Sequence, residues 1–213
     1  MGQTSCLIAG LLFGSATLLA AAPTTIASAE PAGDLRDIRV GAAVADLPPA
    51  GYAGFACATA PDRSLVGWQS WRDCPADAAG MHAVRFGYDP ATDPEGTRVA
   101  GHPVLLTLLI GGDGHVAELR IETDPRARLY LRKKAFLLGA QAKSRYGAEG
   151  WACSEGAPTD RELPVGGVFM NETCMKAADG RKLVVERKLF RRPEQDLKDF
   201  VGETRISVAL AKG

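Results

Sequence analysis

Cysteines carry the clearest chemistry in this chain. Apart from Cys6, which precedes an apolar N-terminal run, they are Cys57, Cys74, Cys153 and Cys174. An even number of cysteines in an exported chain predicts two disulfides. Three pairings are possible. We favour Cys57–Cys74 with Cys153–Cys174, because each bond closes a short loop within one half of the chain, which would stabilise the fold by about 3 kcal/mol per bond.

The pattern of residues offers little support for metal binding or catalysis. No C-x-x-C pair occurs, and cysteine separations of 17 and 21 residues are not zinc-ligand spacings. We expect His82, His102 and His115 in loops or at the surface rather than in one metal site. The motifs of zinc proteases, serine hydrolases, P-loop proteins and c-type haem proteins do not occur. We therefore predict no catalytic residue, no metal and no cofactor.

Two further segments have the composition of ligand-binding loops. Residues 111–114 are glycine-rich, but they separate two apolar stretches and do not open a helix. This favours a hairpin turn over a phosphate-binding loop. Asp89, Asp93 and Glu95 lack the regular spacing of a calcium loop. The two prolines in the same segment favour a turn.

Three tryptophans are candidates for recognising a partner. Trp68 and Trp71 lie between Cys57 and Cys74, and Trp151 lies beside Cys153. Tryptophan often dominates the binding energy of an interface. The more frequent role of such residues is to cover a small core beneath a long loop, and both interpretations remain open at this point.

The charges are divided unevenly along the chain. The 213 residues include 25 basic and 25 acidic side chains. Up to residue 125 there are 7 basic and 14 acidic ones, and the remainder has 18 and 11. Residues 126–148 contain seven basic and no acidic side chains, of which the binding candidates are Arg128, Arg132, Lys133 and Lys134.

This basic segment has two interpretations. The simpler one is a solvated helix face that pairs with the acidic half of the chain. The functional one is an anionic partner: an acidic protein surface, a lipid headgroup layer or an anionic small molecule. The balanced net charge argues against a nucleic-acid partner.

The N-terminus has the layout of a targeting sequence. Residues 1–29 contain no charged side chain, and an apolar run over 7–22 precedes Ala27-Ser28-Ala29. This predicts a secretory signal peptide cleaved after Ala29. The run is short for a membrane span, but no basic residue precedes it, so a retained anchor is the alternative. We expect a periplasmic or secreted protein.

The elements that must position these residues are mainly strands. The stretches 104–110 and 115–122 predict a β-hairpin. A helix is predicted from Pro125 to about Tyr146, ending at Gly147. Its second apolar side, with Leu129 and Phe136, should be covered by a loop. Further strands are expected at 83–88, 165–170, 182–190 and 204–210, and a long loop at 50–80. Short connections favour antiparallel pairing, so the predicted class is α+β with one long helix.

A short pattern occurs twice. Gly54-Phe55-Ala56-Cys57 matches Gly150-Trp151-Ala152-Cys153, and a glycine follows Cys74 and Cys174 at the same distance. This indicates two tandem units, 30–125 and 126–213, as two domains or within one. Coincidence in a chain rich in alanine and glycine is the alternative.

In layout, tandem units of a helix and an antiparallel sheet, each with one disulfide, resemble the secreted β-lactamase-inhibitor-protein architecture. The resemblance extends from Ile38 to about Leu210. It implies protein binding without catalysis, and it assigns no contact residue.

We therefore expect an exported, non-catalytic binding or accessory protein that engages a protein or an anionic ligand. The first alternative is an exported hydrolase with an unrecognised site, which would depend on His102, His115 and carboxylates near the hairpin. The second is a structural envelope protein without a separate ligand.

Overall fold

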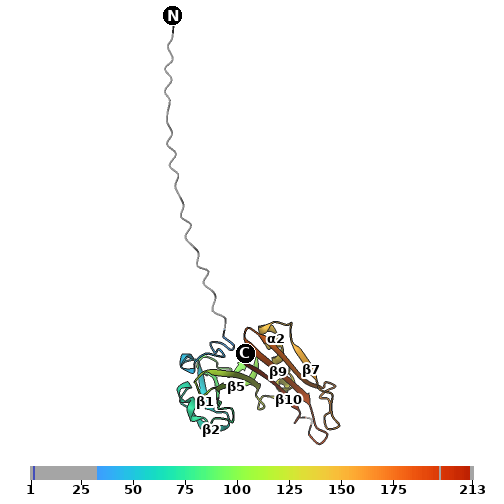
Figure 1. Cartoon of the computed structure of the whole chain (residues 1–213). Coiled ribbons are helices and arrows are strands. Elements are labelled where there is room, and N and C mark those ends of the chain that lie inside the picture. The colour runs from blue at the N-terminus through green and yellow to red at the C-terminus, as the bar shows by residue number, and fades with distance from the viewer. Residues whose placement is uncertain (1, 3–32, 197, 212–213) are drawn as a thin grey trace. The chain divides into compact units, whose positions relative to one another are not determined.

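The structure is a computed structural model that describes Gly2, residues 33–196 and residues 198–211 (Figure 1). The predicted signal peptide and its cleavage point therefore lie outside the described residues, apart from Gly2. The described residues from 33 to 211 belong to one compact unit, and the predicted boundary after residue 125 lies inside it. Within the described residues, no helix combines the length and apolar character needed to cross a membrane.

Antiparallel strands dominate the fold. Strands account for 44% of the described residues and helices for 13%. The sheet has the strand order β2-β1-β3-β5-β6-β10-β9-β8-β7, and β4 pairs with β5 outside this path. In chain order the elements are η1 (Val44–Asp46), β1 (Tyr52–Cys57), β2 (Ala60–Ser64), η2 (Trp68–Asp73), β3 (His82–Tyr88), β4 (Arg98–Val99), β5 (His102–Ile110), β6 (Val116–Thr123), α1 (Leu129–Lys133), α2 (Leu137–Tyr146), β7 (Ala152–Glu155), β8 (Met170–Ala178), β9 (Arg181–Phe190) and β10 (Val201–Leu210).

The predicted α+β class with one long helix is wrong. The segment expected to form that helix contains two short ones, α1 and α2, within a mostly β structure. The carbonyl of Ala135 accepts a hydrogen bond from the Thr204 hydroxyl of β10, at 2.9 Å. The same carbonyl accepts the Leu138 amide at 3.0 Å, and the amides of Lys134 and Gly139 also bond three residues back, as in a 3₁₀ turn. The contact with β10 lies within this interruption of the helix.

Other strand predictions agree with the structure. β5 and β6 form the predicted hairpin, and β3, β9 and β10 lie where alternation placed strands. The predicted long loop at 50–80 is wrong, because it contains β1, β2 and η2. The strand expected at 165–170 instead begins at Met170 and continues as β8 to Ala178.

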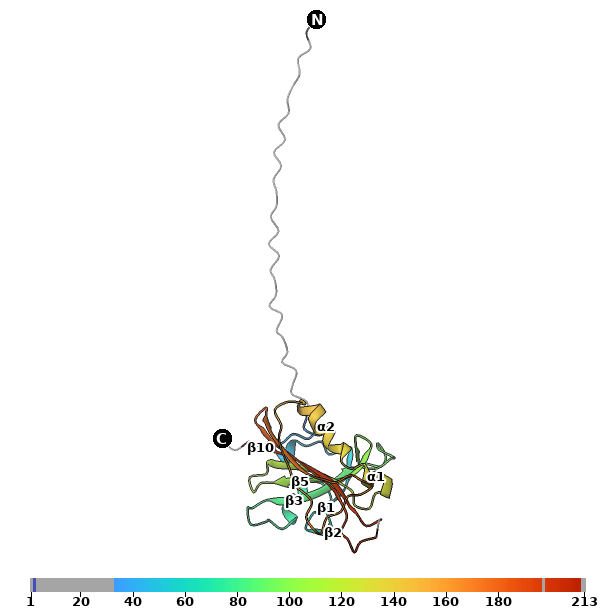
Figure 2. The ribbon, with the colours of Figure 1, turned by 90° about the vertical axis from the view of Figure 1, so that its right-hand side faces the viewer.

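The core lies on one face of the sheet. Leu108 is opposite Val84 on β3 and Leu119 on β6, and Ile206 is opposite Ile121 on β6 and Val185 on β9. Because side chains alternate across a strand, these residues share one face. Helix α2 lies over β9 and β10 on this side (Figure 2). Leu138 and Ala142 of α2 belong to the same core cluster.

Both disulfides form in the pairing that the spacing favoured. Cys57 at the end of β1 is bonded to Cys74, which follows η2, and Cys153 on β7 is bonded to Cys174 on β8. Two such bonds indicate an oxidising environment outside the cytoplasm. The first bond links strand β1 to the residue after a 3₁₀ helix, and the second joins two neighbouring strands. The two halves thus use their disulfides differently. The tandem repeat stays a prediction.

Candidate functional site

Trp68 and Trp71 are core residues. Each is only 5% exposed. The Trp68 ring lies edge-on to Phe55 and Phe86, with centroids 4.6 and 4.9 Å away, and its indole N–H donates to the Pro48 carbonyl at 3.1 Å. The sequence left two roles open for these residues, partner recognition and packing on the core. In the structure both residues pack on the core. The small exposed parts of both residues line a hollow of about 460 Å³, together with Tyr52 and Phe55.

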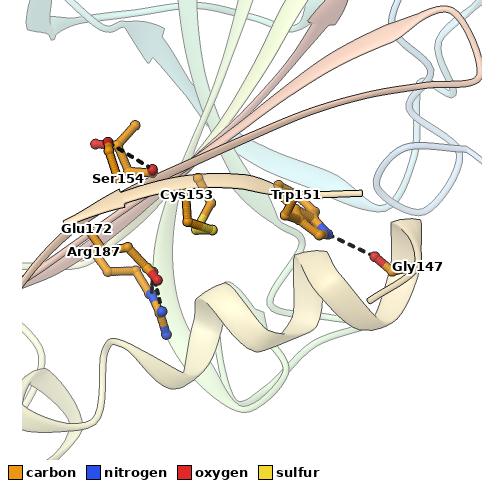
Figure 3. The surroundings of a disulfide bond; sticks show 8 residues. Gly147, Trp151, Cys153, Ser154, Glu172 and Arg187 are labelled. Carbon is orange, nitrogen blue, oxygen red and sulfur yellow. Dashed lines mark hydrogen bonds and ion pairs between the residues drawn. A yellow bond between two sulfur atoms is a disulfide. The ribbon is translucent and has the colours of Figure 1, made fainter. Parts of the chain in front are cut away.

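Trp151 stabilises the connection between α2 and β7 through a hydrogen bond. Its indole N–H donates to the Gly147 carbonyl at 2.8 Å, as Figure 3 shows. The Lys176 amine lies 5.8 Å from the ring centroid and donates to the Glu149 carbonyl at 2.7 Å. These bonds close the chain between the end of α2 and the start of β7. The ring is half-buried, and its polar group is already in use.

A buried ion pair lies beside the second disulfide. The Glu172 carboxylate accepts a hydrogen bond from Arg187 Nε at 2.5 Å, and the pair lies next to Cys153 in Figure 3. Among the described residues, Cys153, Glu172 and Cys174 form a group whose potential metal-ligating atoms lie within 4.8 Å of one another. Both sulfurs belong to the disulfide, so neither is available as a thiolate ligand.

The structure does not bring the histidines of the hydrolase alternative together. His102 begins β5 and His115 follows the turn after it. A strand rises roughly 3.3 Å per residue, so the nine residues of β5 separate the two imidazoles. His82 Nδ1 lies 2.7 Å from the Cys74 carbonyl. Burial, followed by the cations of Arg98 and Lys134, lowers the pKa of His102.

The three carboxylates considered for a calcium loop each interact with a partner within the protein. Asp93 is paired with Arg36. The Asp89 carboxylate accepts the Ala91 amide at 2.9 Å, which is the hydrogen bond of an Asx turn. Glu95 lies 3.9 Å from Arg98. These side chains build a turn, as the prolines indicated.

The open face of the sheet has balanced charges. A hollow of about 460 Å³ lies there. Arg205 reaches Glu122 at 2.7 Å and Glu186 at 3.8 Å across neighbouring strands. The charged residues that line the hollow are Arg85, Arg132, Lys188 and Arg205 against Glu122, Glu186, Asp199 and Glu203. Equal numbers of both signs give this hollow no preference for an anion.

The segment from Arg128 to Leu137 has several exposed apolar and basic side chains. Leu129, Tyr130 and Leu137 are 48%, 57% and 44% exposed. Arg128, Lys133 and Lys134 are also exposed, and within the described part of the chain no carboxylate pairs with them. We call these six residues the α1 surface. The prediction that a loop covers Leu129 is wrong, because this residue is 48% exposed.

Arg132 has a different role from its neighbours. Its guanidinium donates to the Phe200 carbonyl at 2.7 Å and lies 5.0 Å from the centre of the Phe200 ring. This binding candidate therefore fixes α1 to the start of β10. The basic pattern of the sequence did not separate Arg132 from Lys133 and Lys134, and it did not single out Tyr130 or Leu137. Large apolar residues within a segment free of acidic residues were the available signal.

No family model, curated protein or solved structure shows a significant match to this chain. The resemblance to the β-lactamase-inhibitor-protein architecture thus gains no support from these comparisons. It depended on tandem helix-plus-sheet units, whereas the described residues form one continuous sheet.

Proposed function

We propose that this protein is an exported, non-catalytic binding protein that docks on an anionic lipid surface through the α1 surface. The observation that carries the proposal is the mixture of three unpaired cations with three exposed apolar side chains in residues 128–137. The predicted signal peptide and the two disulfides support a periplasmic or secreted location.

The chemistry of the α1 surface suits a lipid headgroup layer. Lysine and arginine near an anionic membrane contribute about 1 kcal/mol each to binding. Leucine and tyrosine on the same short segment enter the boundary between headgroups and acyl chains, where the phenolic hydroxyl stays in contact with water. An acidic protein would also satisfy the cations, and it is the alternative partner that the vesicle experiment separates.

Vesicle co-sedimentation tests the proposal with the cleaved, oxidised protein. We expect binding to phosphatidylcholine vesicles that contain phosphatidylglycerol and weak binding to pure phosphatidylcholine. Replacing Arg128, Lys133 and Lys134 with glutamate should lower the affinity at least a hundredfold, on the order of 1 kcal/mol per cation removed.

A charge-matched variant provides the control. Arg63, Arg161 and Lys182 are exposed, and none has a carboxylate partner among the described residues. Their replacement with glutamate changes the net charge equally but should leave most of the binding intact. Equal loss in both triple variants, or no binding to anionic vesicles, would overturn the proposal. In the second case an acidic protein becomes the next candidate partner.

A further inference from the structure

A small cavity lies between α2 and the sheet, apart from the α1 surface. Its volume is about 190 Å³. The sheet contributes Ile121 from β6 with Ile206 and Val208 from β10, and α2 contributes Ala142. Each of these side chains is at most 5% exposed. The interior of the cavity is therefore apolar, with walls from two neighbouring strands and a helix.

The mouth of the cavity is polar and positively charged. Arg36, Gln141 and Arg145 line it and are exposed. Arg36 is already occupied, since it pairs with Asp93 and its guanidinium lies 3.3 Å from the centre of the Tyr88 ring. Arg145 lies 5.7 Å from the centre of the Tyr146 ring, and no carboxylate of the described residues pairs with it.

The one carboxylate that lines the cavity is neutralised within the fold. Asp34 is 5% exposed. Its oxygens accept hydrogen bonds from the Val40 amide at 2.7 Å and the Tyr146 hydroxyl at 3.2 Å, and Arg181 Nε lies 2.6 Å away. Asp34 therefore adds no unpaired negative charge, and Arg145 remains the uncompensated charge at the mouth.

We propose that this cavity binds a small organic monocarboxylate. Its ring or short alkyl tail would lie against Ile121, Ile206 and Val208, and its carboxylate would meet the Arg145 guanidinium. An engineered apolar cavity of about 150 Å³ in another protein binds benzene, so this volume suits one aromatic ring or a short chain. Arginine matches a carboxylate with two parallel hydrogen bonds. This inference is independent of lipid docking, because it uses none of the six residues of the α1 surface.

Ligand titration followed by NMR tests the inference. Benzoate and hexanoate are the probes, and benzyl alcohol is the neutral analogue of benzoate. We expect saturable shifts at residues lining the cavity. Arg145→Gln should weaken benzoate binding about tenfold and leave benzyl alcohol unchanged, because it removes only the charged hydrogen bonds. The matched control Arg63→Gln removes an exposed cation on β2 and should leave both affinities unchanged.

A second variant tests the apolar interior. Ala142→Leu fills the space between α2 and β10 and should abolish binding of both benzoate and benzyl alcohol. If this variant does not fold, Arg145→Gln still decides the matter because its side chain is exposed. Absence of saturable shifts in the wild-type protein, or equal loss of benzoate affinity in the Arg145 and Arg63 variants, would show that the cavity is not a carboxylate site. Vesicle binding measured on the same variants keeps failure of the lipid proposal separate.

Discussion

Asp34 and Arg181 form a buried ion pair, with 2.6 Å between Oδ1 and Nε. Their side chains are 3% and 16% exposed. Asp34 belongs to the segment that precedes η1, and Arg181 is the first residue of β9. The ion pair therefore connects this N-terminal segment to β9.

We expect Arg181→Met to destabilise the protein by about 3–5 kcal/mol, because it leaves the Asp34 carboxylate buried without its cation. Urea unfolding followed by circular dichroism measures this free energy. Lys182→Met is the matched control, since Lys182 is the exposed neighbour and its loss should change stability by less than about 0.5 kcal/mol. Similar stability of the two variants would refute the structural role of the pair.

Because of Tyr146, we expect the free energy of unfolding to decrease at alkaline pH. Burial, followed by the nearby Asp34 charge, raises the pKa of Tyr146 to about 12. The tyrosine of an unfolded chain loses its proton near about pH 10. Between these values the unfolded state binds fewer protons than the folded state, so stability decreases as pH rises. Below pH 10 both states hold the proton and the contribution is complete.

The variant Tyr146→Phe isolates this effect. It should lose less stability than the wild type between pH 10 and pH 12. Burial, followed by the charge of Asp37, raises the pKa of Tyr52 to about 12 as well, so some alkaline dependence remains in the variant. Urea unfolding at several pH values gives the slope, and identical slopes for both proteins would contradict the assignment.

The two disulfides should differ in their rate of reduction. Cys153 is exposed on the edge strand β7, whereas Cys57 and Cys74 are 0% and 2% exposed. A reducing thiolate must reach a sulfur atom. Brief treatment with dithiothreitol under native conditions, alkylation and mass spectrometry should therefore label Cys153 and Cys174 before Cys57 and Cys74. Simultaneous labelling of all four would indicate global unfolding instead.

Gly139 permits close contact between α2 and β9. A Cβ atom at this position would lie 2.7 Å from Cδ of Arg187 and 3.2 Å from Cγ1 of Val185. Alanine normally stabilises a helix interior by about 1 kcal/mol relative to glycine. Here we expect Gly139→Ala to destabilise by about 1–2 kcal/mol through overpacking. Thermal unfolding measures the sign, and a rise in the melting temperature would exclude this close packing.

The exposed apolar residues of the α1 surface should serve binding rather than folding. Replacing Leu129, Tyr130 and Leu137 with serine should leave the free energy of unfolding within about 1 kcal/mol of the wild type, since surface changes are individually small. The same variant should lose binding to anionic vesicles. A large loss of stability would instead assign these side chains to the fold.

Some interpretations depended on local pattern and others on distant contacts. Alternation around Val84, Leu119 and Ile206 indicated strands because one face of each strand is buried. The tryptophans had two possible roles, because burial depends on which elements pack around them. Trp68 meets Phe86 from β3, a contact that the loop sequence alone does not specify.

The sequence by itself determined the β5–β6 hairpin and several strands, because hairpin turns and alternating side chains depend on neighbours in the chain. It favoured one of three disulfide pairings, and the structure contains that pairing. Only the tertiary structure revealed the break in the predicted long helix, where the Thr204 hydroxyl reaches the Ala135 carbonyl across 69 residues. It also decided the neutralisation of Asp34, which Tyr146 contacts across 112 residues. Such bonds form only when the sheet brings distant segments together, and no local pattern encodes them.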